Sequence, residues 1–119
     1  MDDRRPKTQL GGSALRDRRY TIRYPFAADA ELIDLASGAR TEGVTSDLSP
    51  GGCFVCTSRP FALNGRTRIT LKRKDQQFEA FGIVRVFKPR IGMGIEFVDV
   101  DGPSRAVLDR WIEQLRNAR

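Results

Sequence analysis

The sequence predicts a small all-β domain, a closed or nearly closed barrel, that is preceded by a basic arm and followed by one amphipathic helix. Three observations predict it: short β-rich runs broken by turn residues, a change to helical periodicity near the C-terminus, and a concentration of positive charge near the N-terminus. The chain has 119 residues, of which 39% are hydrophobic and 30% charged. Such a chain is long enough for one domain with a modest core.

Residues 1–15 mix charged residues with Pro6, Gly11 and Gly12 and show no apolar periodicity, which predicts a flexible arm. Residues 1–25 carry seven basic and three acidic side chains, and the whole chain has a net charge of +6. A basic arm favours a phosphate-bearing partner, whether a nucleotide, a nucleic acid or an anionic membrane. A solvated, solubilising tail is the alternative.

No apolar run approaches the ~20 residues of a membrane span, and the N-terminus lacks the apolar region of a signal peptide. We therefore expect a cytoplasmic protein without a membrane span. The six predicted strands are residues 27–35, 41–48, 53–57, 67–72, 78–87 and 94–98. Between the second and third strands, Ser49-Pro50-Gly51-Gly52 fits a type II turn, with proline second and a positive-φ glycine third.

A helix is predicted over about residues 103–117, after Pro103 and its neighbouring capping residues. Its apolar residues recur with helical spacing and form one stripe, made of Val107, Leu108, Trp111, Ile112 and Leu115. We expect this stripe to pack on the barrel; a helix that binds a partner is the alternative.

Cys53 and Cys56 form a C-x-x-C within a β-type run, where this spacing sends the two side chains to opposite faces. The chain has no histidine and no second cysteine pair. We therefore expect ordinary strand cysteines rather than a zinc or redox site.

Arg19 and Arg23 form an R-x-x-x-R in a β-favouring segment. In an extended chain these residues project to the same side roughly 13 Å apart. Two guanidiniums at that spacing can grip separate parts of one elongated ligand. Arginine can donate paired hydrogen bonds to guanine or phosphate oxygens, and its flat face can stack on a base.

Asp47, Ser49, Gly51 and Gly52 lie where a strand meets its turn. Asp47 could accept from the N1–H and N2–H₂ edge of guanine, Ser49 could add a hydroxyl contact, and the glycines would let the backbone approach a ligand. Asp and Ser are also favoured at such junctions because they bond the local backbone, so a structural role is the alternative.

Together the two motifs resemble the two-part ligand signature of PilZ domains. The matching positions are Arg19, Arg23, Asp47, Ser49 and Gly52. Arg18 matches an arginine doublet that is frequent in the family, and the resemblance covers about residues 16–119. It implies a six-stranded antiparallel PilZ-type β-barrel that binds cyclic di-GMP and needs no other cofactor. It also implies a receptor that orders its N-terminal arm on binding and signals to an effector protein controlling motility, biofilm or exopolysaccharide.

Three other functions were weighed. A small basic barrel that binds nucleic acid would present aromatic and basic residues on one strand face, whereas the phenylalanines here lie mostly in apolar strand contexts. A PilZ-fold interaction module without a ligand is disfavoured by the intact motifs. An enzyme is disfavoured because the sequence has no histidine, no paired acidic cluster and no nucleophile elbow.

Overall fold

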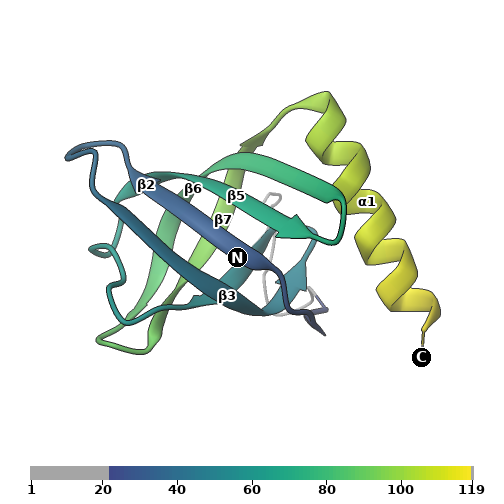
Figure 1. Cartoon of the computed structure of the whole chain (residues 1–119), viewed down its shortest axis with the longest axis horizontal. Coiled ribbons are helices and arrows are strands. Elements are labelled where there is room, and N and C mark those ends of the chain that lie inside the picture. The colour runs from purple at the N-terminus through teal and green to yellow at the C-terminus, as the bar shows by residue number, and fades with distance from the viewer. Residues whose placement is uncertain (1–21, 119) are drawn as a thin grey trace, which may run out of the picture.

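The computed structural model describes residues 22–118, so the predicted arm of residues 1–15 lies outside the described part. The elements in chain order are β1 (Tyr24–Pro25), β2 (Asp29–Asp34), β3 (Arg40–Ser49), β4 (Gly52–Cys56), β5 (Arg66–Arg73), β6 (Gln76–Lys88), β7 (Gly92–Val100) and α1 (Gly102–Asn117). Strands β2 to β7 pair antiparallel in the order β3-β2-β5-β6-β7-β4, and pairing of β4 with β3 closes the barrel (Figure 1). The predicted six-stranded barrel with a C-terminal helix is therefore confirmed, with β1 as an additional short strand.

β1 is a separate short strand before β2, and the predicted first strand, residues 27–35, covers β2 alone. Both segments pair with β3, but β1 lies against its last residues and β2 against its first. Between them the buried Thr45 hydroxyl donates to the Phe26 carbonyl at 2.6 Å and accepts from the Ala28 amide at 2.9 Å. The backbone bonds here as well, from the Thr45 amide to the Ala28 carbonyl at 3.0 Å. On its other side, β3 shifts register against β4 between Thr45 and Asp47, as at a β-bulge.

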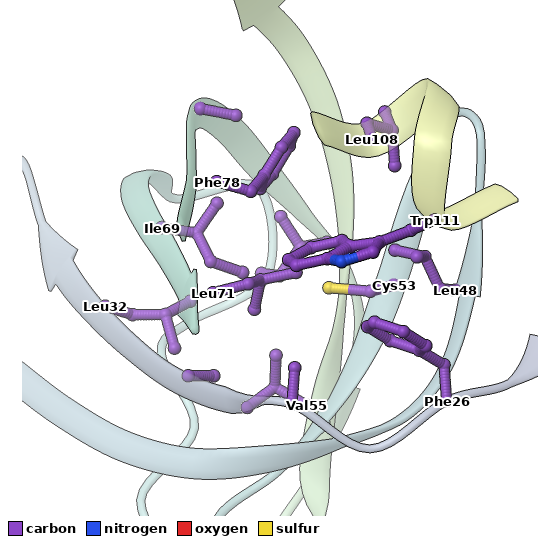
Figure 2. Packing of buried hydrophobic residues seen from close by; sticks show 14 of the residues in the cluster. Phe26, Leu32, Leu48, Cys53, Val55, Ile69, Leu71, Phe78, Leu108 and Trp111 are labelled. Carbon is purple, nitrogen blue, oxygen red and sulfur yellow. The ribbon is translucent and has the colours of Figure 1, made fainter. Parts of the chain in front are cut away.

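The core fills the barrel and continues under the helix (Figure 2). Within α1, Leu108, Trp111 and Ile112 are buried, while Val107 and Leu115 are partly buried against the core. The Trp111 ring lies 5.0 Å from the Phe26 ring, centroid to centroid. The predicted stripe therefore packs on the barrel.

Two polar contacts at the start of α1 fix its position. The Asp101 carboxylate caps the helix by accepting from the Ser104 amide at 2.8 Å, as favoured at a helix N-terminus. The Ser104 hydroxyl accepts from the Glu79 amide of β6 at 2.9 Å. Farther along, Trp111 Nε1 donates to Gln76 Oε1 at 2.8 Å, so the buried indole is satisfied.

The strand connections divide between two ends of the barrel. α1 and the β3–β4 turn lie toward one end, on the right in Figure 1. The β2–β3 turn, the β4–β5 loop and the β6–β7 turn lie at the other end, on the left. Within residues 22–118, no helix is long and apolar enough to cross a membrane.

Candidate functional site

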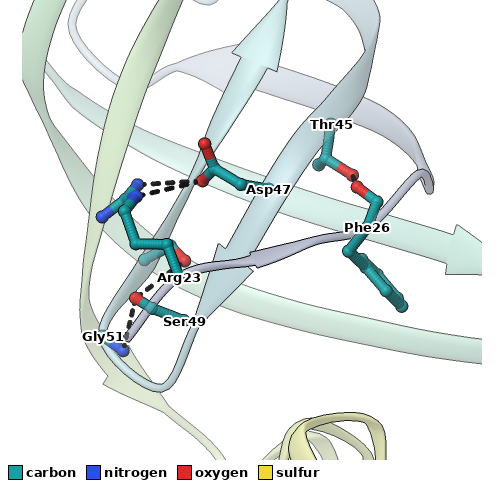
Figure 3. Close-up of polar contacts among 7 residues, drawn as sticks. Arg23, Phe26, Thr45, Asp47, Ser49 and Gly51 are labelled. Atoms are coloured by element: carbon teal, nitrogen blue, oxygen red, sulfur yellow. Dashed lines mark hydrogen bonds and ion pairs between the residues drawn. The ribbon is translucent and has the colours of Figure 1, made fainter. Parts of the chain in front are cut away.

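The pairing of β1 with β3 brings Arg23 to Asp47, although 24 positions separate them in the chain. Arg23 Nε donates to Asp47 Oδ1 at 3.2 Å, and Nη2 lies 3.0 Å from the same oxygen (Figure 3). The side chains are 49% and 29% exposed. Both contacts end on the same carboxylate oxygen, Asp47 Oδ1, and both side chains are partly exposed, so the ion pair is open to solvent and to a competing donor.

The Ser49–Gly52 turn lies directly beyond this pair. The Ser49 hydroxyl is buried, accepts from the Gly51 amide at 3.3 Å and donates to the Gly52 carbonyl at 3.3 Å. The Gly51 carbonyl accepts from the Phe97 amide of β7 at 2.9 Å. Ser49 therefore stabilises the turn from inside, as serine does in local backbone motifs.

The prediction of a type II turn here is wrong. That turn requires a positive φ at its third residue, which is Gly51, and the only glycine with positive φ among the described residues is Gly38. The Gly51 amide bond to Ser49 and the two-residue connection between paired Ser49 and Gly52 set the geometry instead.

A glycine is required at position 52 by the close approach of two strands and not by the conformation of the turn. A Cβ atom at this position would lie 2.2 Å from the Ile95 carbonyl oxygen of β7. The backbones of β4 and β7 thus approach too closely for any side chain. Around Gly51, by contrast, an added Cβ would meet nothing within 4 Å. The turn consequently offers open backbone next to Asp47.

Phe54 is a neighbour of the site that the motifs did not reveal. It is directly paired with Asp47 across the β3–β4 ladder and is only partly buried. Lys88 Nζ lies 5.5 Å from the centre of its ring, and the ring covers Gly92 of β7. Strand alternation puts Phe54 on the same face as Gly52, two residues earlier, but does not show that it lies opposite Asp47.

Arg73 contacts Phe26 and Ala27, which follow Arg23 and β1 in the chain. Its Nη1 atom donates to the Ala27 carbonyl at 2.9 Å, and its guanidinium carbon lies 4.6 Å from the centre of the Phe26 ring. Phe26 in turn packs on Trp111. The position of Arg23 is therefore coupled to the core and to the helix.

The two cysteines face opposite sides of β4, as predicted: Cys53 is buried and Cys56 exposed. Burial raises the pKa of the Cys53 thiol, the Asp47 charge raises it further, and Arg23 opposes them. Such a thiol stays protonated and unreactive. No group of three potential metal ligands occurs within residues 22–118.

The site thus joins a carboxylate, a guanidinium, free turn backbone and an aromatic side chain on one outer surface of the barrel. The predicted residues Arg23, Asp47, Ser49, Gly51 and Gly52 lie together there. The remaining two predicted residues, Arg18 and Arg19, lie outside the described part of the chain.

Comparison with known proteins gives a consistent family. Residues 17–114 match the family model described as the PilZ domain. No curated protein matches the chain. Among solved structures, the PilZ domain of YcgR from Escherichia coli, determined with c-di-GMP, aligns with a TM-score of 0.69 at 17% identity, covering 86% of this chain and 94% of that one.

Two further structures share the fold. The PilZ domain of CeSA from a cellulose-synthesizing bacterium aligns with a TM-score of 0.63 at 21% identity, covering 80% of this chain and 98% of that one. The Bacillus subtilis inhibitor of motility MotI/DgrA aligns with a TM-score of 0.68 at 18% identity, covering 87% of this chain but only 54% of that one. With the family model matching most of its length, this chain belongs to the PilZ domain family.

Proposed function

We propose that this protein is a receptor for cyclic di-GMP and that Arg23, Asp47 and the Ser49–Gly52 turn form the barrel half of its binding site. The observation that carries the proposal is the contact between Arg23 and Asp47, which joins the two ligand motifs on one solvent-facing surface. The c-di-GMP complex of the YcgR PilZ domain, which shares this fold, supports it.

Each group has a chemical role in the proposal. The Asp47 carboxylate accepts from the N1–H and N2–H₂ edge of a guanine, and Arg23 donates to guanine or phosphate oxygens. Phe54, paired with Asp47, gives a base an aromatic side chain to stack on. Ser49 acts through the turn, because its hydroxyl already serves Gly51 and Gly52.

Binding exchanges the Arg23–Asp47 ion pair for contacts to the ligand. An exposed pair of this kind is worth up to about 1 kcal/mol, so its loss costs little. Stacking of two guanines and two paired arginine contacts, at ~1–3 kcal/mol each, give very roughly 4–12 kcal/mol before costs. Micromolar affinity needs about 8 kcal/mol, so further contacts are required.

In this proposal Arg19 makes the second of the two paired arginine contacts, and Arg18 adds a further contact. An extended chain advances at most ~3.6 Å per residue, which lets Arg19 reach ~14 Å from Arg23 and close on the far side of the ligand. The segment before Ile22 then becomes ordered on binding and presents a new surface to an effector protein. The domain extends over residues 16–119 in this account and acts as a receptor, not as an enzyme.

The experiment is a calorimetric titration of cyclic di-GMP into the wild type, Arg19→Ala, Arg23→Ala and a matched control. Arg68→Ala is the control because Arg68 is also 49% exposed and also pairs with a carboxylate, that of Glu79. We expect both motif variants to lose measurable binding and the control to keep it. Unchanged affinity in both motif variants would refute the proposal.

A further inference from the structure

The end of the barrel opposite α1 combines exposed aliphatic side chains with positive charge. Each of its three connections presents one exposed aliphatic residue: Leu35 in the β2–β3 turn, Leu63 in the β4–β5 loop and Ile91 in the β6–β7 turn. They are 48%, 54% and 61% exposed. Figure 1 shows the three connections projecting at this end, which we call the distal end.

Positive charge surrounds these residues. The connecting segments 34–40, 57–66 and 88–92 contain five basic residues and one acidic residue, Asp34. Asp34 accepts from the amide and hydroxyl of Ser37. The four arginines of the distal end are Arg40, Arg59, Arg66 and Arg90. None of them forms an ion pair with another residue of the described range 22–118.

Backbone hydrogen bonds hold two of the three exposed aliphatic residues, Ile91 and Leu35, in place. The Ile91 amide donates to the Lys88 carbonyl at 3.0 Å, and the Ile91 carbonyl accepts from the Thr57 amide at 3.0 Å. The Leu35 amide donates to the Arg66 carbonyl at 3.0 Å. Their exposure is thus a built feature of the turns and does not come from loosely held loops.

Arg90 places a positive charge directly beside Ile91. Its φ is +61°, a left-handed conformation that glycine or asparagine adopts at lower cost. An arginine at this position keeps a charge beside Ile91 at the expense of backbone strain. Lys74 in the β5–β6 turn has a similar φ of +57°, so this conformation belongs to the turn, and the charge beside Ile91 is what Arg90 adds.

We propose that the distal end docks on an anionic membrane surface. The aliphatic residues stand on three separate connections, an arrangement that suits insertion into a broad surface. The arginines beside them match lipid phosphates, since basic side chains near an anionic bilayer each raise affinity about fivefold. Leucine and isoleucine give no stacking platform for bases, so the arrangement favours a lipid surface over a single-stranded nucleic acid.

The aliphatic residues of the distal end lie apart from Asp47 and the Ser49–Gly52 turn, although Lys88 reaches the Phe54 ring beside the nucleotide site. Arg40 begins β3 and Asp47 lies seven residues along it, or roughly 20 Å at the rise of a β-strand. A membrane-docked barrel would thus keep Asp47 and the Ser49–Gly52 turn accessible. The inference goes beyond the proposed function, and its test needs no nucleotide.

The test is co-sedimentation of the full chain with vesicles of phosphatidylcholine, alone or with about one third phosphatidylglycerol to give an anionic surface. We expect binding to the anionic vesicles only, weakening as salt rises. Ile91→Ser should lower affinity about tenfold by removing apolar contact. Arg59→Gln with Arg66→Gln should lower it about 25-fold.

Two control variants test whether vesicle binding depends on the distal end itself and not on the net charge of the protein or on its stability. Arg105→Gln with Arg110→Gln removes the same charge from the exposed face of α1 and should leave binding unchanged. Arg90→Gly removes one charge, so it should bind vesicles about fivefold more weakly. It also relieves the backbone strain, so its midpoint of urea unfolding should stay the same or rise.

Three outcomes overturn the proposal. The first is no binding to anionic vesicles. The second is equal weakening by the distal and α1 pairs, which would assign binding to net charge, including that of the basic N-terminal residues. The third is distal-end-dependent binding of polyglutamate or a single-stranded oligonucleotide, measured by fluorescence anisotropy, without vesicle binding. That result would mean an acidic protein or a nucleic acid partner.

Discussion

Asp47→Ala separates a ligand-binding carboxylate from one that only supports the fold. In the structure Asp47 is 29% exposed and its carboxylate pairs with Arg23, which is 49% exposed. An ion pair with that much solvent access contributes at most about 1 kcal/mol to the free energy of unfolding. We therefore expect urea unfolding of the variant to differ from wild type by no more than that amount.

The same substitution should be severe for ligand binding. In the proposed complex Asp47 accepts two hydrogen bonds from a guanine edge, and hydrogen bonds to a charged group contribute about 1.5–3 kcal/mol each. Their loss weakens affinity by roughly 10²–10⁴-fold. Calorimetry with cyclic di-GMP measures this directly.

Glu79→Ala provides the matched control for Asp47→Ala. Glu79 is 32% exposed, pairs with Arg68 and lies on a different strand, β6. It should lose a similar small amount of stability and no affinity. The opposite result would be a loss of more than about 2 kcal/mol in the free energy of unfolding for Asp47→Ala, roughly twice the limit for such a pair, together with normal cyclic di-GMP binding. The carboxylate would then be structural and our assignment wrong.

Four further predictions concern the framework that holds the site. Gly52→Ala would place a Cβ 2.2 Å from the Ile95 carbonyl oxygen, so β4 and β7 would have to move apart. Urea unfolding should show a loss of about 1–3 kcal/mol in the free energy of unfolding. Gly51→Ala should lose less, because an added Cβ there meets nothing within 4 Å. Asp101→Ala removes the cap that accepts from Ser104 and should cost about 0.5–2 kcal/mol, read from the same transition; no change would mean that the helix start is held by packing alone. In the native protein a thiol reagent should modify Cys56 quickly and Cys53 only on unfolding, because Cys53 is buried, and two equally fast thiols would contradict this. Burial raises the pKa of Cys53, so as pH rises the thiol loses its proton in the unfolded chain before it does so in the folded protein. The stabilisation from the buried neutral thiol is therefore complete below pH ~8.5 and declines above it. Cys53→Ala should lack this decline.

Local sequence patterns were sufficient to predict the barrel strands and the helix. Short β-rich runs between turn residues recover β3 to β7, and the spacing of Leu108, Trp111 and Ile112 predicts the buried side of α1. The interruption between β1 and β2 was not predictable, since it depends on the Thr45 hydroxyl reaching Phe26 and Ala28 from a distant strand.

Turn geometry shows the same limit. Pro50-Gly51 suggests a type II turn, but Gly51 instead follows the bonds made by Ser49 and Phe97. Lys74, in the β5–β6 turn, has a φ of +57°, which its side chain gives no reason to expect. In both places strand pairing sets the backbone and the residues adapt.

For the candidate site, the sequence placed Arg23 and Asp47 in the same functional unit, and the structure brings them into contact. Their role toward a ligand stays a prediction, as do the roles of Arg18 and Arg19. Phe54 was missed because its position opposite Asp47 follows from the register of β3 and β4, including the bulge at Thr45. No local pattern encodes that register.

The most direct test is the specificity of binding, measured by calorimetric titration of the wild type with cyclic di-GMP and with cyclic di-AMP. The proposed Asp47 contact requires the paired N1–H and N2–H₂ donors of guanine, which adenine lacks. We predict saturable binding of cyclic di-GMP and an affinity for cyclic di-AMP at least about a hundredfold weaker, from the loss of two hydrogen bonds to a charged acceptor. No heat with cyclic di-GMP, or equal affinity for the two ligands, would contradict the account.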